Sequence, residues 1–125
     1  VIIPKRHSAG LTAAAVKASA GAAVCLPVVR VANIAAAMQR LKQEKNVWFT
    51  CADMDGQNWC TLDFSGAAGP VIASEGNGVS RLATEECDFV AALPMRGQIN
   101  SLNASVAGGV ILYEIARQKM QPKAR

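Results

Sequence analysis

Two polar segments that contain glycine hold the residues whose types and spacing suit binding chemistry. Residues 74–78 read SEGNG and combine the carboxylate of Glu75 with two glycines that follow it. Residues 93–103 read LPMRGQINSLN and end in Ser101 and Asn103. Glycine lets a backbone approach a ligand without a Cβ in the way, while Glu, Ser and Asn supply hydrogen-bonding groups. Each segment alone can also be explained without a ligand: the first as a strand-to-helix turn in which Ser80 caps the next helix, the second as a capped loop. The surrounding elements must decide.

The composition predicts a packed domain. Of the 125 residues, 51% are hydrophobic and 18% are charged, which favours a folded core over disorder. The net charge of +4 permits RNA or another polyanion as a partner but does not require one. No apolar run reaches the roughly 18 residues of a membrane span, and the N-terminal stretch does not have the form of a signal peptide. We therefore expect neither a membrane anchor nor a membrane partner.

The cysteines do not form a metal-binding pattern. Cys25, Cys51, Cys60 and Cys87 include no CxxC pair, and the chain has a single histidine. A zinc site needs several such ligands at short spacing, so no metal is expected. Buried free thiols of a cytosolic protein are the better interpretation.

Apolar runs alternate between strand and helix patterns along the chain. Strands are expected at residues 1–4, 27–31, 46–51, 70–74 and 88–93, and helices at 11–23, 33–45, 80–87 and 103–119. Residues 52–69 are expected to form a loop with at most one helical turn, and Trp48 is expected in the core. This order indicates an α/β fold with a mostly parallel sheet and helices on both faces.

In such folds, ligands bind at the carboxyl ends of the strands. The two polar segments follow the fourth and fifth expected strands, so both belong to that edge. Gly108 and Gly109 interrupt the last helix and each costs roughly 1 kcal/mol relative to alanine. A close contact of the helix with a strand or a partner subunit would offset that cost.

Together, residues 71–118 resemble motifs two and three of the SpoU, or TrmH, family of RNA ribose 2′-O-methyltransferases. The family pattern is roughly G-x-E-G-x-G, then C-D, then I-P-M-x-G, then S-L-N-x-S-V-A. The chain matches this pattern at Glu75, Gly76, Gly78, Cys87, Asp88, Pro94, Met95, Gly97, Ser101, Leu102, Asn103, Ser105, Val106 and Ala107. It departs at Ala73, where glycine is usual, and at Leu93, where isoleucine is usual. Residues 1–34 are similar to the middle of the same domain, nearest the branch that methylates guanosine in 23S ribosomal RNA.

The resemblance implies a SPOUT fold, an α/β domain over residues 1–125 with a C-terminal trefoil knot at about residues 70–118. It also implies S-adenosylmethionine as the cofactor. The implied cofactor-binding residues are Ala73, Ser74, Gly76, Leu93, Pro94, Met95 and Leu102. The implied catalytic residues are Glu75, Ser101 and Asn103. Arg81 and Arg96 flank the motifs and are suggested contacts to RNA phosphates.

The implied activity is transfer of a methyl group to a ribose 2′-hydroxyl, with a guanosine of 23S ribosomal RNA as the expected target. A cytoplasmic homodimer packed through the knot region is implied as well. The family's first motif, N-x-G-x-x-x-R, supplies the leading candidate for a catalytic arginine, and the spacing of Arg30 and Arg40 does not reproduce it. We therefore expect the chain to lack the first βα unit and to be weakly active or inactive by itself. The alternatives are a non-catalytic RNA-binding remnant of this fold, and a plain nucleotide-binding or dimerisation module.

Overall fold

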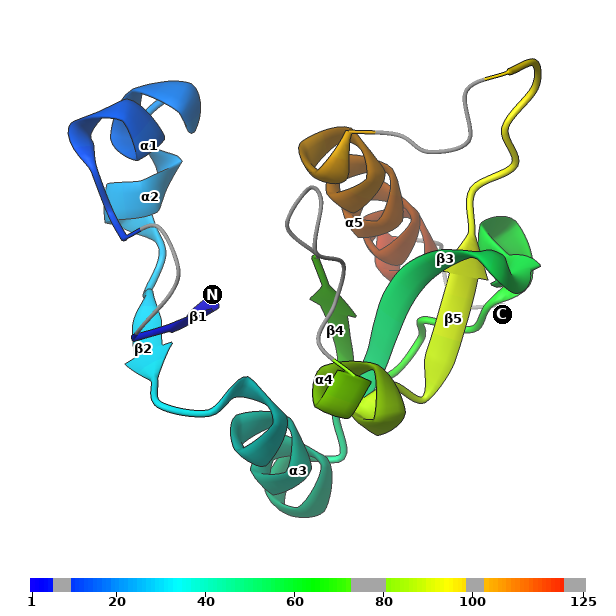
Figure 1. Ribbon diagram of the computed structural model, residues 1–125, viewed down its shortest axis with the longest axis horizontal. Helices are drawn as coiled ribbons and strands as arrows, with labels where there is room; N and C mark the ends of the chain where they lie inside the picture. The colour runs from blue at the N-terminus through cyan, green and yellow to red at the C-terminus, as the bar shows by residue number, and fades with distance from the viewer. Residues whose placement is uncertain (6–9, 73–80, 99–102, 121–125) are drawn as a thin grey trace. The chain divides into compact units, whose positions relative to one another are not determined.

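A computed structural model describes residues 1–5, 10–72, 81–98 and 103–120. Its elements are shown in Figure 1 and are, in chain order, β1 (Ile2–Pro4), α1 (Ala13–Ala18), α2 (Ala22–Cys25), β2 (Val29–Val31), α3 (Ile34–Lys45), β3 (Trp48–Asn58), the 3-10 helix η1 (Trp59–Thr61), β4 (Ala68–Val71), α4 (Arg81–Glu86), β5 (Phe89–Ala92) and α5 (Ala104–Met120). The chain divides into two compact units, Val1–Ala37 and Met38–Arg125. The prediction of a single domain over residues 1–125 stays a prediction.

In the first unit, β1 and β2 form a parallel pair and two short helices connect them. Thr12 caps α1, because its hydroxyl accepts a hydrogen bond from the backbone N–H of Ala15 at 3.1 Å. The prediction of one helix over residues 11–23 is wrong. Ala20 and Gly21 have φ angles of 52° and 85°, so the chain leaves the helical conformation there and starts again as α2.

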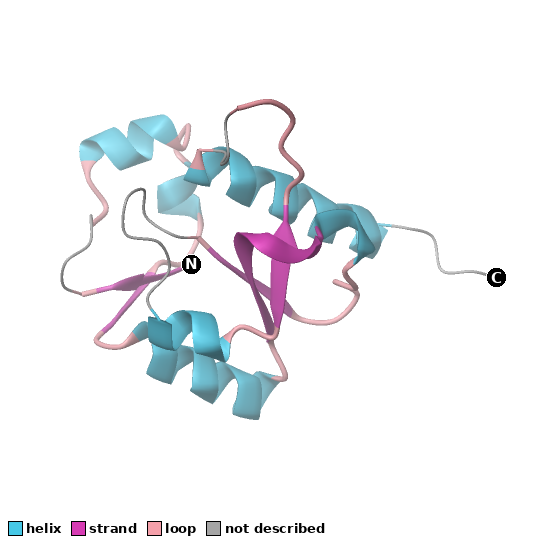
Figure 2. Ribbon diagram, turned by 45° about the vertical axis from the view of Figure 1, so that its right-hand side comes forward, coloured by secondary structure: helices cyan, strands magenta, loops and turns pink. Residues whose placement is uncertain are grey.

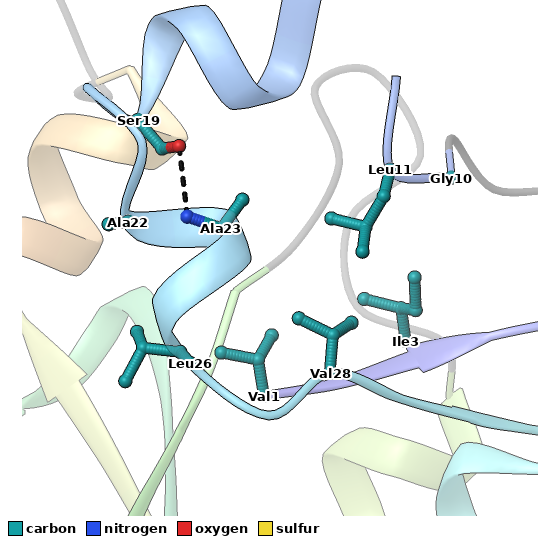
Figure 3. A pocket seen from close by; sticks show the side chains of 9 residues that line it. All are labelled: Val1, Ile3, Gly10, Leu11, Ser19, Ala22, Ala23, Leu26 and Val28. Carbon is teal, nitrogen blue, oxygen red and sulfur yellow. Dashed lines mark hydrogen bonds between the residues drawn. The ribbon is translucent and has the colours of Figure 1, made fainter. Parts of the chain in front are cut away.

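The first unit also contains a shallow apolar hollow, shown in Figure 3. Its lining residues are Val1, Ile3, Gly10, Leu11, Ser19, Ala22, Ala23, Leu26 and Val28. The Ser19 hydroxyl is already engaged, since it donates to the Val16 carbonyl at 2.9 Å and accepts from the Ala23 N–H at 3.1 Å. Among the described lining residues, Ser19 has the one polar side chain, so we do not take this hollow as the candidate site.

Helix α3 follows the predicted pattern. The side chain of Asn33 accepts a hydrogen bond from the backbone N–H of Ala36 at 3.0 Å, which confirms the predicted cap. Met38 is buried, and Ile34 and Leu41 are half-buried on the same side of the helix. The apolar periodicity that predicts this helix thus corresponds to its less exposed side.

The second unit is built on a parallel sheet of strand order β4-β3-β5, drawn in magenta in Figure 2. Trp48 of β3 is paired with Ala68 of β4, and Thr50 of β3 is paired with Phe89 of β5. The predicted parallel sheet is confirmed here. The predicted loop over residues 52–69 is wrong in part, because β3 continues to Asn58, η1 follows, and β4 already begins at Ala68.

Helices cover both faces of this sheet, as the alternating pattern predicts. On one face, Ile111 of α5 packs with Ala91 of β5 in the main hydrophobic core, together with Leu62 and Phe64. On the other face, the thiol of Cys87, which directly follows α4, lies close to the Cys51 thiol of β3. Burial, followed by the neighbouring Cys51, raises the pKa of Cys87 to about 12.

Charged groups tie α3 to the start of β5. The ammonium of Lys42 lies 3.2 Å from a carboxylate oxygen of Asp88, and it donates to the backbone carbonyl of Glu86 at 3.0 Å. The other carboxylate oxygen of Asp88 accepts from the backbone N–H of Phe49 at 2.8 Å. Asp88, the Asp of the C-D motif, thus holds the start of β5 against β3. β5 in turn leads to the second polar segment.

Two expectations about burial are wrong. Trp48 is 54% exposed, and its ring stacks on Phe89 with the ring centroids 5.6 Å apart. All four cysteines are free, and Cys25 and Cys60 are exposed, while only Cys51 is fully buried. Among the residues that the structure describes, no helix is long and apolar enough to cross a membrane.

Candidate functional site

The candidate site begins where two strands end at one edge of the parallel sheet. β4 and β5 lie on either side of β3 and run in the same direction, so the chain leaves both at the same edge. Neighbouring strands are ~4.8 Å apart, which places these two exits about 10 Å from each other. Residues 73–80 and 93–103 follow these exits, in agreement with the α/β pattern.

The described part of the second segment combines apolar side chains with a turn. Leu93 and Met95 are half-buried, whereas Pro94 and Arg96 are exposed. Gly97 has a φ of 101°, a conformation that side chains other than hydrogen disfavour, so glycine is required at this predicted turn. The segment therefore presents a small apolar surface next to main-chain groups at the sheet edge.

Asn103 lies at the N-terminus of α5 and caps it. Its side-chain oxygen accepts from the backbone N–H groups of Ser105 and Val106, at 2.9 and 3.4 Å, and from the Ser105 hydroxyl. These bonds satisfy N–H groups that have no partner inside the helix. The predicted position at the helix start is confirmed, and the predicted catalytic role stays a prediction.

The first turns of α5 pack against the end of β4. A Cβ added at Gly108 would lie 2.8 Å from the Cδ1 atom of Ile72, which directly follows β4. The glycine thus permits a close approach to the strand end, as predicted from its cost inside a helix. Gly109 has no such contact, because a Cβ there would meet nothing within 4 Å. The contact between Gly108 and Ile72 places the start of α5 against the end of β4, two residues before the first polar segment.

Several predicted site residues lie outside the described residues. These are Ala73, Ser74, Glu75 and Gly76 of the first segment, and Ser101 and Leu102 of the second. The structure describes Leu93, Pro94, Met95 and Asn103, and it places them on the segment that joins the end of β5 to the start of α5.

The two arginines suggested as RNA contacts are exposed. Arg81 begins α4, its side chain is 90% exposed, and its Nε donates to Glu85 at 3.0 Å. Arg96 is exposed and forms no ion pair with any part of the chain that the structure describes. In the same described ranges, no cluster of His, Cys, Asp and Glu could hold a metal ion.

A buried polar cluster that the sequence reasoning missed anchors the second half of α5. The carboxylate of Glu114, only 4% exposed, accepts from Arg117 at 2.7 and 2.8 Å and from Gln118 at 3.0 Å. Gln118 in turn accepts from the N–H of Phe64 at 2.7 Å and donates to the carbonyl of Leu62 at 2.8 Å. Hydrogen bonds from Arg117 and then Gln118 lower the pKa of Glu114 to about 2. The signal in the sequence was the i, i+3 and i, i+4 spacing of these side chains.

A parallel α/β sheet with polar segments at its carboxyl edge defines a class of nucleotide- and cofactor-binding domains. The family described as the SpoU rRNA Methylase family has a model that matches residues 1–113. The chain belongs to this family.

Named relatives and a solved structure agree with this assignment. The chain is 43% identical over 121 residues to the 23S rRNA (guanosine-2′-O-)-methyltransferase RlmB of Haemophilus ducreyi, covering 96% of this chain and 49% of that protein. It is 41% identical to the RlmB of Pasteurella multocida, covering 96% and 49%. The crystal structure of the SpoU methyltransferase AviRb from Streptomyces viridochromogenes, in complex with the cofactor AdoMet, matches with a TM-score of 0.84 and 27% identity, covering 95% and 49%. The chain thus spans about half the length of the curated relatives it matches.

Proposed function

We propose that the chain forms the cofactor-binding part of an S-adenosylmethionine-dependent RNA ribose 2′-O-methyltransferase. The observation that carries this proposal is the family match over residues 1–113, which includes the motif residues at the carboxyl edge of the sheet. Ribosomal RNA is the proposed substrate, with a guanosine of 23S ribosomal RNA as the proposed target. The names of the RlmB relatives support this choice.

The residues at the sheet edge fit S-adenosylmethionine. Leu93 and Met95 provide half-buried apolar surface of the kind that accommodates an adenine ring. Ile72 is 50% exposed at the end of β4 and adds apolar surface on the other side of β3. The main-chain N–H and C=O groups of the residues that follow the last sheet pairs can form hydrogen bonds with the polar groups of the cofactor. We propose that residues 73–76 and Leu102 provide further contacts to the cofactor. We also propose that the C-terminal region is knotted, as the resemblance implies.

The chemistry is displacement at a methyl carbon. When bound, the cofactor supplies a methyl group on a positively charged sulfur, and the bond from carbon to sulfur breaks as the ribose 2′-oxygen forms its bond to that carbon. A hydroxyl is a weak nucleophile, so the protein must accept its proton and align it. We propose that Asn103, with Glu75 and Ser101, orients the hydroxyl, and that an arginine of the family's first motif completes the site. Arg81 and Arg96 are proposed phosphate contacts, because both guanidinium groups belong to exposed residues that flank the motif segments.

Methyl transfer to RNA tests this function. Unmodified ribosomal RNA is incubated with tritiated S-adenosylmethionine and with this chain extended upstream by a segment that carries the first motif. We expect label in the RNA at a nucleotide that resists alkaline hydrolysis, because a methylated 2′-oxygen cannot attack the adjacent phosphate. Label on a base, or no label with a folded protein that binds the cofactor, would contradict the proposed reaction.

Asn103 allows its capping role to be separated from a catalytic one. Replacing it by alanine removes the cap and is expected to lower the free energy of unfolding by about 1 kcal/mol. We also expect lower turnover at a temperature where the variant is fully folded, because Asn103 is proposed to orient the substrate. The control is Asn103→Asp, which keeps a cap oxygen and should keep the stability. If Asn103→Ala has unchanged turnover and unchanged cofactor affinity, Asn103 is only a cap.

We propose that the protein is a homodimer through α5. Val106, Leu112 and Tyr113 are 51, 54 and 82% exposed, so the chain's own sheet does not cover them. A second copy that covers this apolar surface would stabilise the dimer. By sedimentation at micromolar concentration, we expect a dimer that Tyr113→Glu converts to a monomer. Val24→Glu, at a 72% exposed position in α2, is the control. A wild-type protein that sediments as a monomer would refute the dimer.

We also propose a cytoplasmic location. An RNA substrate and four cysteines that are all free thiols support it. Fractionation of cells that express the tagged protein would test the location.

A further inference from the structure

Strand β3 makes an excursion beside the candidate site. Ala52 and Gln57 of β3 are both paired with Ala91 of β5, so the four residues Asp53–Gly56 leave the ladder and return to it. Ala91 is fully buried at 0% exposure, and it is therefore held by β3 from both ends of the excursion. The last pair of the ladder, between Asn58 and Ala92, directly precedes the second polar segment.

The excursion ends at a glycine that touches the backbone of β5. A Cβ added at Gly56 would clash with the carbonyl oxygen of Val90, and it would lie 2.7 Å from the carbonyl carbon and 2.8 Å from the Cγ1 atom of the same residue. Two of these three atoms belong to the main chain, so rotation of the Val90 side chain would not relieve the clash. Any residue with a Cβ at position 56 must move either the excursion or β5.

A displacement of β5 would also move residues 93–95, because they directly follow the strand. Only Ala91 and Ala92 separate Val90 from Leu93, and Leu93 and Met95 form the apolar surface proposed to accept the cofactor. The pairs of Gln57 and Asn58 with β5 transmit the position of the excursion to that segment. We propose that Gly56 is a positioning residue. It lets β3 pack closely against β5, and it thereby holds residues 93–95 in the position that cofactor binding requires. This inference rests on the proposed function.

The test is the affinity of this chain for S-adenosylmethionine, measured by calorimetry well below the unfolding temperature. Gly56→Ala is expected to weaken binding about tenfold, because misplacement of a binding group by a fraction of an ångström has effects of this order. Gly66→Ala is the matched control, since a Cβ at Gly66 meets nothing within 4 Å, and it should bind like the wild type. Adding Val90→Ala to Gly56→Ala should not restore binding, because the main-chain clash remains.

The outcomes separate this inference from the proposed function. If neither the wild type nor Gly66→Ala binds the cofactor, the proposed function is contradicted. If both bind and Gly56→Ala binds equally well, or if Val90→Ala restores its binding, the positioning role is overturned.

A measurement on the wild type keeps the inference testable if Gly56→Ala does not fold. Amide hydrogen exchange of residues 56–58 should slow on cofactor addition together with that of residues 90–95, while exchange at Gly66 should not change. Protection of residues 90–95 without protection of 56–58 would overturn the inference.

Discussion

Extending the chain upstream by a segment with the N-x-G-x-x-x-R pattern is expected to raise its rate of methyl transfer to ribosomal RNA about 100-fold or more. The physical reason is that a group acting in the transition state commonly contributes an effect of this size. The described residues of the sheet edge supply apolar surface at Leu93 and Met95 and a helix start capped by Asn103. The 125-residue chain should bind the cofactor weakly and transfer methyl groups slowly.

The comparison needs a control that adds the same strand and helix without the arginine. The extended chain with that arginine replaced by alanine should fold as well as the extended chain and should have the low rate of the unextended one. If the chain and its extension have equal rates, the first motif is dispensable and the arginine is not catalytic. If the alanine variant keeps the high rate, the added strand acts through stability alone.

Glu114→Gln is expected to lower the free energy of unfolding of the second unit by about 2 kcal/mol, because it weakens buried hydrogen bonds to a charged group. The carboxylate receives two bonds from Arg117 and one from Gln118, and Gln118 fastens α5 to the backbone of residues 62–64. In the variant, the side-chain N–H₂ group that replaces one carboxylate oxygen must face an N–H donor of Arg117 or Gln118. Urea unfolding followed by tryptophan fluorescence measures the effect, because Trp48 and Trp59 both belong to this unit.

The effect of Glu114→Gln should depend on pH. The folded-state pKa of Glu114, about 2, lies below its usual 4.5, so the ionised carboxylate stabilises the fold fully above that usual value. This stabilisation is lost as the pH falls toward the folded-state pKa. The difference between wild type and variant should therefore shrink below about pH 4.5. Glu44→Gln, which breaks an exposed pair with Arg40, is the control and should cost at most about 0.5 kcal/mol. A pH-independent difference for Glu114→Gln would show that the charge is not responsible.

The strand and helix order could be read from the sequence because it depends on local patterns. Asn33 and Asn103 have the side chains that cap helices, and both begin helices as predicted. Gly108 signalled a close contact, and the structure supplies one with Ile72. The parallel sheet followed from the alternation of the elements, which placed the two polar segments at one edge.

The features that sequence reasoning missed depend on contacts between distant residues. The second half of β3 is mostly polar and has no strand periodicity. It nevertheless pairs with β5, and at Gly56 it approaches Val90 so closely that a Cβ would clash. Trp48 has a core-like side chain, yet whether a helix covers it depends on the packing of the whole sheet. The helix break at Ala20 occurs within an alanine-rich stretch, where local propensity favours one continuous helix.

A titration of this chain with S-adenosylmethionine, followed by amide chemical shifts, tests the proposed cofactor site. We predict saturable binding, with the largest shift changes in residues 72–80 and 93–106, and no comparable changes with ATP at the same concentration. A folded chain that binds ATP equally well would indicate a general nucleotide-binding module. A folded chain whose shifts do not change with S-adenosylmethionine, or change only in residues 1–37, would contradict a cofactor site at the carboxyl edge of the β4-β3-β5 sheet.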